Sequence, residues 1–195
     1  MSELIRPNDL NPFFILKYLQ PHLLIPDLEV ESLNDINFDL LEQMRIKNFI
    51  LDVDNTLCSY HGTSVDRKIE FVFQRMKRDY NLCILSNTTD ERRADLEYYF
   101  GVAVVNTNVK KPRRQAFLKA LGYLRAVPSV TAMIGDRLFT DITGANYLGI
   151  YSIKVNPIDR YSDPPPVKIS RNLEEYLLSL YKQMYKYGLD FHPIL

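Results

Sequence analysis

The feature that most constrains the fold is an alternation, from about residue 48 onward, between short apolar runs and amphipathic stretches. Runs of this length are typical of strands buried on both faces of a parallel sheet. Between the runs, apolar residues recur at helical spacing, which predicts connecting helices. The pattern predicts an α/β fold: a Rossmann-like three-layer sandwich with a mostly parallel five-stranded sheet. The five runs are 49–51, 82–85, 102–105, 130–134 and 150–153.

The same pattern divides the chain into a core and two ends. Residues 48–155 carry the alternation, so we expect them to form the core. Residues 1–47 contain four prolines and an apolar stretch at 13–16. We expect this part to be an extension that packs on the core, with a short helix at the apolar stretch, an extended segment to about Val30 and a helix over 38–44.

Prolines and glycines mark the expected ends of the later elements. Residues 156–195 begin with a proline-rich stretch to about 166, which predicts a loop or linker. A final helix is expected over 172–187, where leucines recur at helical spacing. Gly101 and Gly122 each follow a helical stretch, where a left-handed capping residue is expected.

Composition excludes several classes of protein. The 24 Lys+Arg and 24 Asp+Glu residues balance, so the chain lacks the overall positive charge of a general nucleic-acid binder, and no nucleic acid is expected as a partner. No apolar run approaches the ~18 residues of a membrane-spanning helix, and the first residues do not resemble a signal peptide. We therefore expect a cytoplasmic protein. The two cysteines, Cys58 and Cys83, are too few for a disulfide scaffold.

Two carboxylates follow the first predicted core strand. Asp52 and Asp54 stand two residues apart, directly after an apolar run. Open α/β sheets bind ligands at the carboxyl ends of their strands, and paired carboxylates there offer the hard oxygen ligands that Mg²⁺ prefers. The alternative is purely structural, because Asp and Asn are also common turn residues.

Further polar residues follow the next predicted strands in register. Ser86 stands 34 residues after Asp52, Lys111 stands 25 residues after Ser86, and Asp136 stands 25 residues after Lys111. Each step spans one strand-helix unit, so all four should lie at one edge of the sheet. A hydroxyl, an ammonium group and a third carboxylate beside a carboxylate pair would suit phosphoryl transfer. Taken singly, each residue could instead be a helix cap, a solvated charge or a turn residue.

These motifs resemble those of the haloacid-dehalogenase-like (HAD) hydrolase superfamily, and most closely its YqeG-type branch. The resemblance covers about residues 28–155 and implies a phosphatase. Proteins of this branch include phosphatidylglycerophosphate phosphatases, so it also implies a lipid phosphate as the substrate. The motifs are Leu51-Asp52-Val53-Asp54-Asn55-Thr56-Leu57, Leu85-Ser86-Asn87, Lys111-Pro112, Ile134-Gly135-Asp136 and Thr140-Asp141-Ile142.

The resemblance implies a role for each motif residue. Asp52 would be the nucleophile that becomes an aspartyl-phosphate, and Asp54 the general acid and then the general base. Ser86 would donate to a phosphoryl oxygen, and Lys111 would neutralise charge there. Mg²⁺ would be held by the Asp52 carboxylate, the Asp54 backbone carbonyl and the Asp136 carboxylate. Asp141 would lie close to these ligands without binding the ion directly. The residues expected to bind substrate are Thr56, Asn87, Lys110, Arg113 and Arg114.

The spacing of the motifs predicts a core without a cap domain. Thr56 and Ser86 are separated by 29 residues, and Ser86 and Lys111 by 24. Each gap is nearly filled by one helix and one strand, whereas an inserted domain needs at least ~50 residues. An open crevice would admit a large or membrane-embedded phosphate ester, or a partner subunit would have to cover it.

The basic cluster at residues 110–114 opens a predicted helix, where positive charge is unfavourable. Lipid phosphate, an anionic membrane surface or RNA would offset that cost, and a solvated charged face is the alternative. The apolar stretch at 13–19 could lie at a bilayer interface or pack on the core. Peripheral contact with the inner face of a membrane is therefore one expectation. The sequence leaves the oligomeric state open.

The sequence is compatible with three functions. The first is an Mg²⁺-dependent phosphomonoesterase acting on phosphatidylglycerophosphate. The second keeps the chemistry with a soluble sugar phosphate or nucleotide as substrate. The third is a regulatory domain in which the aspartyl-phosphate persists, and Asp54 argues against it because a poised base promotes hydrolysis.

Overall fold

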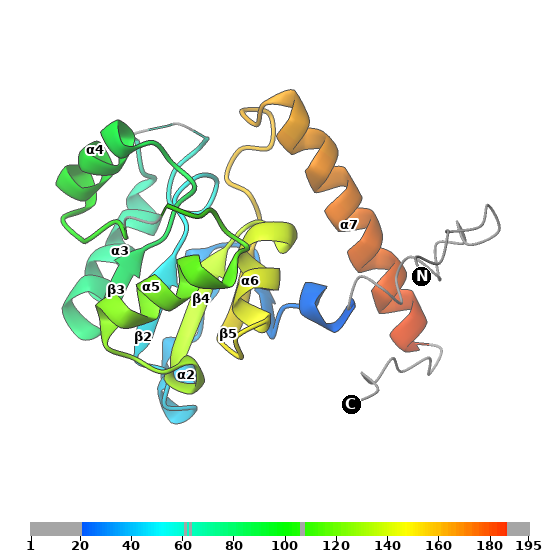
Figure 1. Ribbon diagram of the computed structural model, residues 1–195, viewed down its shortest axis with the longest axis horizontal. Helices are drawn as coiled ribbons and strands as arrows, with labels where there is room; N and C mark the ends of the chain where they lie inside the picture. The colour runs from blue at the N-terminus through cyan, green and yellow to red at the C-terminus, as the bar shows by residue number, and fades with distance from the viewer. Residues whose placement is uncertain (1–20, 61, 63, 106–107, 187–195) are drawn as a thin grey trace, which may run out of the picture.

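A five-stranded parallel sheet forms the centre of the molecule (Figure 1). The computed structural model describes residues 21–60, 62, 64–105 and 108–186, so the helix predicted at 13–16 lies outside the described residues. The strand order is β1-β5-β4-β2-β3, and every described strand pair is parallel, which confirms the predicted α/β sandwich. The strands are β1 (Leu28–Val30), β2 (Asn48–Leu51), β3 (Asn81–Ile84), β4 (Thr131–Gly135) and β5 (Tyr151–Val155).

One of the five strands differs from the prediction. The run at 102–105 forms only an isolated bridge, between Ile84 and Val104, so the prediction of a strand there was wrong. The fifth strand is β1, from the N-terminal extension, which pairs with β5. Asp27, just before β1, accepts hydrogen bonds from the backbone N–H and the hydroxyl of Ser152, which hold this edge in register. An apolar run shows that a segment is buried, but not how many ladder hydrogen bonds it makes.

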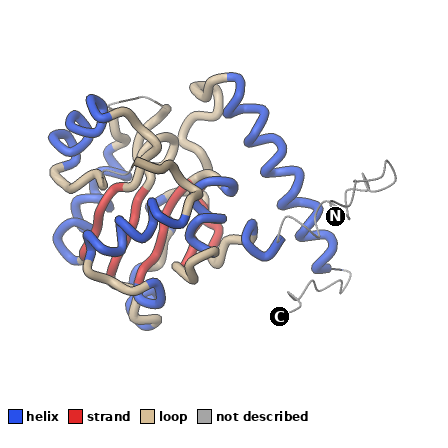
Figure 2. Tube along the Cα trace, viewed as in Figure 1, coloured by secondary structure: helices blue, strands red, loops and turns tan. Residues whose placement is uncertain are grey.

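Helices cover both faces of the sheet, as Figure 2 shows. The predicted helix over 38–44 is confirmed as α2, and α7 begins seven residues before the predicted start at 172. The start of α7 was predicted too late because Pro165 and Pro166 suggested a loop or linker. Proline is, however, also favoured in the first turn of a helix. The longer helices are α2 (Phe38–Gln43), α3 (Arg67–Asp79), α4 (Asp90–Phe100), α5 (Arg114–Leu124) and α7 (Pro165–Lys186). The short ones are η2 (Pro21–Leu24), η3 (Leu33–Asp35), η4 (Pro128–Val130), η5 (Leu138–Ile142) and α6 (Thr143–Asn146).

The two glycines predicted as caps behave differently. Gly101 caps α4 with φ 61°, as predicted. Gly122 lies inside α5 instead, and Arg125 takes the left-handed position with φ 49°. The helix continues past Gly122 because Leu124 is buried against the sheet, and this burial offsets the cost of glycine within a helix.

The alternation of side chains along β2 divides the core into two layers. Phe49 and Leu51 point into a cluster that includes residues of α2 and α3, whereas Ile50 points into a second cluster with residues of α5 and α6. In Figure 1, α5 crosses in front of the strands. This packing places the carboxyl ends of β2 and β4, which pair directly, side by side.

The predicted absence of a cap domain agrees with the described residues. Between Thr56 and Ser86 they form α3 and β3, and between Ser86 and Lys111 they form α4.

A third apolar cluster attaches α7, through Leu177 and Leu178, to η2 and η5. Within the described part of the chain, no helix combines the length and apolar content needed to cross a membrane.

Close packing between α5 and α6 generates a stability prediction. A Cβ atom added at Gly144 would overlap the ring of Phe117, whereas one added at Gly122 would meet nothing within 4 Å. We expect Gly144→Ala to lower the free energy of unfolding by about 1–3 kcal/mol, because the overlap forces α5 and α6 apart. Gly122→Ala, the control, should leave it unchanged or raise it by up to about 1 kcal/mol. Urea denaturation measures both, and equal effects would contradict this packing.

Candidate active site

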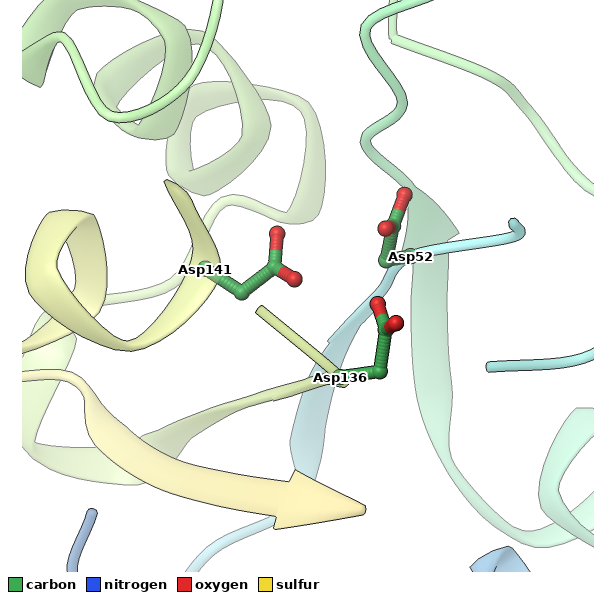
Figure 3. Close-up of side chains that lie close together, drawn as sticks. All are labelled: Asp52, Asp136 and Asp141. Carbon is green, nitrogen blue, oxygen red and sulfur yellow. The ribbon is translucent and has the colours of Figure 1, made fainter. Parts of the chain in front are cut away.

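Three buried carboxylates face a common space at the carboxyl ends of β2 and β4 (Figure 3). Asp52 directly follows β2, Asp136 directly follows β4, and Asp141 lies in η5. One oxygen of each lies within 4.8 Å of the others. The Asp52 backbone N–H donates to the Ile134 carbonyl at 2.9 Å, which continues the strand pairing up to the site. The predicted convergence of Asp52 and Asp136 is therefore present, with Asp141 as a full member of the cluster.

Gly135 allows Asp141 to lie close to the end of β4. A Cβ atom at this position would overlap the Asp141 carboxyl group. The Arg137 backbone N–H donates to Asp141 Oδ2 at 3.0 Å and so holds the oxygen that lies closest to Gly135. The Gly135-Asp136 motif thus serves two purposes, since it supplies one carboxylate and makes room for another.

Lys111 joins the three carboxylates as their cation. Its Nζ lies 2.8 Å from Asp52 Oδ1 and 2.7 Å from Asp141 Oδ1, and the side chain is buried. Burial alone would lower the pKa of Lys111, but Asp141 and Asp52 more than offset this and raise it. The neighbouring Lys110 is exposed, so Lys111 is the lysine that reaches the site.

Asn87 holds the backbone of Lys111 in place. Its Oδ1 accepts from the Lys111 N–H at 2.8 Å, and its Nδ2 donates to the Lys111 carbonyl at 3.2 Å. Both functional groups of the Asn87 amide are thus used to position the lysine. Asn87 also lines the pocket at this site, and its expected part in substrate binding stays a prediction.

The charge of the cluster is suited to a divalent cation. Four buried carboxylates and two buried cations in direct contact carry a net formal charge of −2, which one divalent cation would balance: Asp52, Asp136, Asp141 and Asp163 against Lys111 and Arg171. Burial raises the pKa of Asp52 to about 6 and that of Asp136 to about 8, and the nearby Asp141 carboxylate adds to both shifts. Asp136 Oδ1 is buried and has no hydrogen-bond partner among the described residues. Carboxylate oxygens are the ligands that Mg²⁺ prefers, so these residues fit that ion.

Asp54 is held away from the other carboxylates by an arginine that the sequence analysis missed. Arg92 donates from Nη1 to Asp54 Oδ2 at 2.7 Å and from Nη2 to Asp54 Oδ1 at 2.6 Å. The pair is partly exposed, at 17% for Arg92 and 21% for Asp54. Arg92 is one of several charged residues in the first turns of α4, and no spacing pattern distinguishes it.

These residues surround a pocket of about 360 Å³. Asp52, Asp54, Ser86, Lys111 and Asp136 all line it, so the structure brings the predicted catalytic residues together. Four of the predicted substrate-binding residues are absent from the lining: Thr56, which is buried, and the exposed Lys110, Arg113 and Arg114. Arg113 precedes the first residue of α5 and Arg114 is that residue, so the basic cluster opens a helix as expected, but of this cluster only Lys111 lines the pocket.

The C-terminal part of the chain also lines the pocket, which the sequence analysis did not predict. Asp163 and Arg171 contribute side chains that are buried at the mouth of the site. Arg137, next to Asp136, pairs with Glu174 of α7 at 2.7 Å. These residues belong to no motif, and the proline-rich stretch before them suggested only a linker.

Neither cysteine is suited to act as a nucleophile. Cys58 and Cys83 are both buried and unpaired. Burial raises the pKa of Cys58 to about 11 and that of Cys83 to about 12, so both thiols stay protonated near neutral pH.

Comparisons with known proteins agree with this site. The family model described as mitochondrial PGP phosphatase matches residues 13–158. The chain is 28% identical over 160 residues to the probable phosphatase YqeG of Bacillus subtilis, covering 82% of this chain and 92% of that protein. It is 29% identical over 170 residues to the mitochondrial phosphatidylglycerophosphatase of Saccharomyces cerevisiae, covering 80% and 91%.

A longer plant relative matches over part of its length. This is phosphatidylglycerophosphate phosphatase 1, chloroplastic/mitochondrial, of Arabidopsis thaliana, which is 27% identical over 175 residues. The match covers 85% of this chain and 49% of that protein. The chain thus spans about half the length of this relative.

The raised pKa values predict how a divalent cation and pH act together on stability. Without a cation, Asp52 and Asp136 take up protons on folding, so their contribution to stability is present at low pH and is lost as the pH rises through about 6 and then about 8. A bound cation would favour the charged carboxylates. The increase in Tm when Mg²⁺ is added to chelator-treated protein should therefore be larger at pH 8 than at pH 5, as measured by calorimetry. Equal increases at the two pH values would contradict the cluster as a cation site, and K⁺ at matched ionic strength is the control.

Proposed function

This chain belongs to the mitochondrial PGP phosphatase family, and we propose that it is a magnesium-dependent phosphatase that removes the terminal phosphate of phosphatidylglycerophosphate. The observation that carries the proposal is the buried cluster of Asp52, Asp136 and Asp141 around Lys111 at the carboxyl edge of the sheet. The Asp52 and Asp136 carboxylates and the Asp54 backbone carbonyl would hold Mg²⁺, with Asp141 beside them. When bound, Mg²⁺ supplies positive charge that offsets repulsion between the phosphate and the carboxylates.

The first half of the reaction transfers the phosphoryl group to the protein. An oxygen of the Asp52 carboxylate attacks phosphorus, and the bond between phosphorus and the ester oxygen breaks. Lys111 and Ser86 stabilise the negative charge on the phosphoryl oxygens. Asp54 gives a proton to the departing alkoxide. Each Asp54 oxygen accepts one hydrogen bond from Arg92, which leaves a second lone pair on each oxygen to carry that proton.

The second half of the reaction regenerates Asp52. Asp54, now a carboxylate, takes a proton from a water molecule whose oxygen attacks phosphorus. The bond between phosphorus and the Asp52 oxygen breaks, and inorganic phosphate leaves. Because Asp54 lies at the partly exposed mouth of the pocket, it can reach both the leaving group and the incoming water.

Two observations support a lipid substrate. The curated relatives from Saccharomyces cerevisiae and Arabidopsis thaliana carry the name of this lipid phosphatase activity. On α7, the exposed apolar side chains of Ile169, Leu173 and Tyr176 recur at helical spacing and form an outward-facing stripe, on the side of the helix opposite Val167, which lines the pocket. Peripheral contact with a membrane that presents the substrate is part of the proposal.

Replacing the nucleophile tests the reaction. Asp52→Asn should lower turnover by about 10³-fold or more, because an amide cannot attack phosphorus as a carboxylate does. Phosphate release from dispersed phosphatidylglycerophosphate measures this, with and without Mg²⁺. Asp39→Asn on α2 is the matched control, since that carboxylate is 82% exposed and lies outside the pocket. Full activity of Asp52→Asn would rule out the aspartyl-phosphate route.

A panel of substrates tests the lipid specificity. We expect kcat/KM for phosphatidylglycerophosphate in vesicles to exceed that for glycerol 3-phosphate, sugar phosphates and nucleotides by at least about tenfold, because the lipid leaving group adds binding energy outside the pocket. Phosphate release at equal concentrations of each ester provides the measurement. A preference for a soluble ester would support the second candidate function, and a stable phosphorylated protein that releases no phosphate would support the third.

A further inference from the structure

We propose that Arg171, in the second turn of α7, is a positioning residue for the metal site. It holds one oxygen of the Asp136 carboxylate so that the other remains available to a cation. The inference rests on the proposed function, because it concerns the Mg²⁺ site that this function requires. The family model matches residues 13–158, so Arg171 lies outside the matched part of the chain.

The guanidinium group of Arg171 spans two buried carboxylates. Its Nη2 donates to Asp136 Oδ2 at 2.7 Å, and its Nε donates to Asp163 Oδ2 at 2.8 Å. The three side chains are 5%, 1% and 1% exposed. A planar fork of donors can hold two carboxylates in fixed orientations at once, which the single ammonium group of lysine does less well. Asp136 Oδ1 is left without a hydrogen-bond partner among the residues that the structure describes.

Arg171 is itself anchored to the loop that carries the nucleophile. Asp163 Oδ1 accepts from Asn55 Nδ2 at 2.7 Å, and Asn55 lies three residues after Asp52. Asn55 Oδ1 in turn accepts from the Asp159 backbone N–H at 2.9 Å. The chain of contacts from Asn55 through Asp163 and Arg171 to Asp136 thus joins the loop after β2 to the loop after β4. Any change in Arg171 should alter the position of one metal ligand relative to the other.

The attachment of α7 does not depend on the contact between Arg171 and Asp136. Glu174 accepts from the side chain of Arg137 and from the backbone N–H of Leu138 at 3.0 Å, and Leu177 and Leu178 pack in an apolar cluster. These contacts hold the helix against the core one turn further along. Arg171 is therefore placed where its main effect is on Asp136.

Substitutions at Arg171 separate positioning from simple charge. If Arg171 acted only through its positive charge, Arg171→Lys would bind Mg²⁺ as the wild type does, and Arg171→Gln would bind it more tightly. If Arg171 positions Asp136, both substitutions should raise the Kd for Mg²⁺ by about 10–100-fold, which is typical for residues that orient metal ligands. Isothermal titration of chelator-treated protein with Mg²⁺ alone gives the Kd without reference to activity.

Two further variants complete the experiment. Arg160→Gln is the matched control, because Arg160 forms an exposed ion pair with Glu175 in the same part of the chain and should leave the Kd unchanged. The variant Asp163→Asn retains Arg171 but has one acceptor oxygen at position 163 in place of two. Only one of the hydrogen bonds from Asn55 and Arg171 can then form, so this variant should also have a raised Kd for Mg²⁺. It provides the test if a substitution at Arg171 prevents folding, which thermal unfolding in chelator reports. Wild-type affinity in Arg171→Lys and Asp163→Asn would overturn the inference, whereas a wild-type protein that binds no Mg²⁺ would overturn the proposed function itself.

Discussion

Repulsion among buried carboxylates is the constraint on which the rest of the site depends. Asp52, Asp136 and Asp141 lie too close together for all three to be charged in a dry interior without positive partners. Lys111 offsets part of this repulsion, and the parallel strands and the tight approach at Gly135 maintain the crowding. A protein selected for stability alone would avoid such an arrangement. We infer that these crowded carboxylates at the carboxyl edge of the sheet serve to bind a cation and the phosphoryl group of a substrate.

The central part of this arrangement could be predicted from the sequence because strand order and motif spacing obey simple geometry. Polar residues that end buried parallel strands must meet at one edge, which located Asp52, Ser86 and Asp136. Lys111 reaches the same edge although the run before it forms only an isolated bridge to Ile84. Arg92 could not be found in this way, because it reaches the site from a helix through a long side chain. The contacts between Asn87 and the Lys111 backbone could not be predicted either, since a motif identifies a residue but not which of its neighbours takes its hydrogen bonds.

The errors in the fold have a related origin. Apolar runs report burial, and both the strand β1 and the run at 102–105 are at least partly buried, but only β1 forms a ladder. The proline-rich stretch before α7 indicated a loop or linker, because the sequence does not reveal the long-range contacts that hold this stretch in place. The segment from residue 158 to Glu174 is instead bonded to both loops of the site. Long-range contacts of this kind are invisible to any local pattern.

The origin of β1 has a consequence for how the core can be isolated or joined to other segments. β1 comes from residues before the motif-bearing core and occupies the outer side of β5. A fragment that started at residue 48 would leave unpaired those backbone N–H and C=O groups of β5 that now bond to β1. Open edges of that kind recruit strands from other molecules, so such a fragment would tend to self-associate. With the N-terminal segment in place, the open edge on this side of the sheet is the 3-residue strand β1 rather than the 5-residue strand β5, and short edge strands are one way in which proteins limit such pairing.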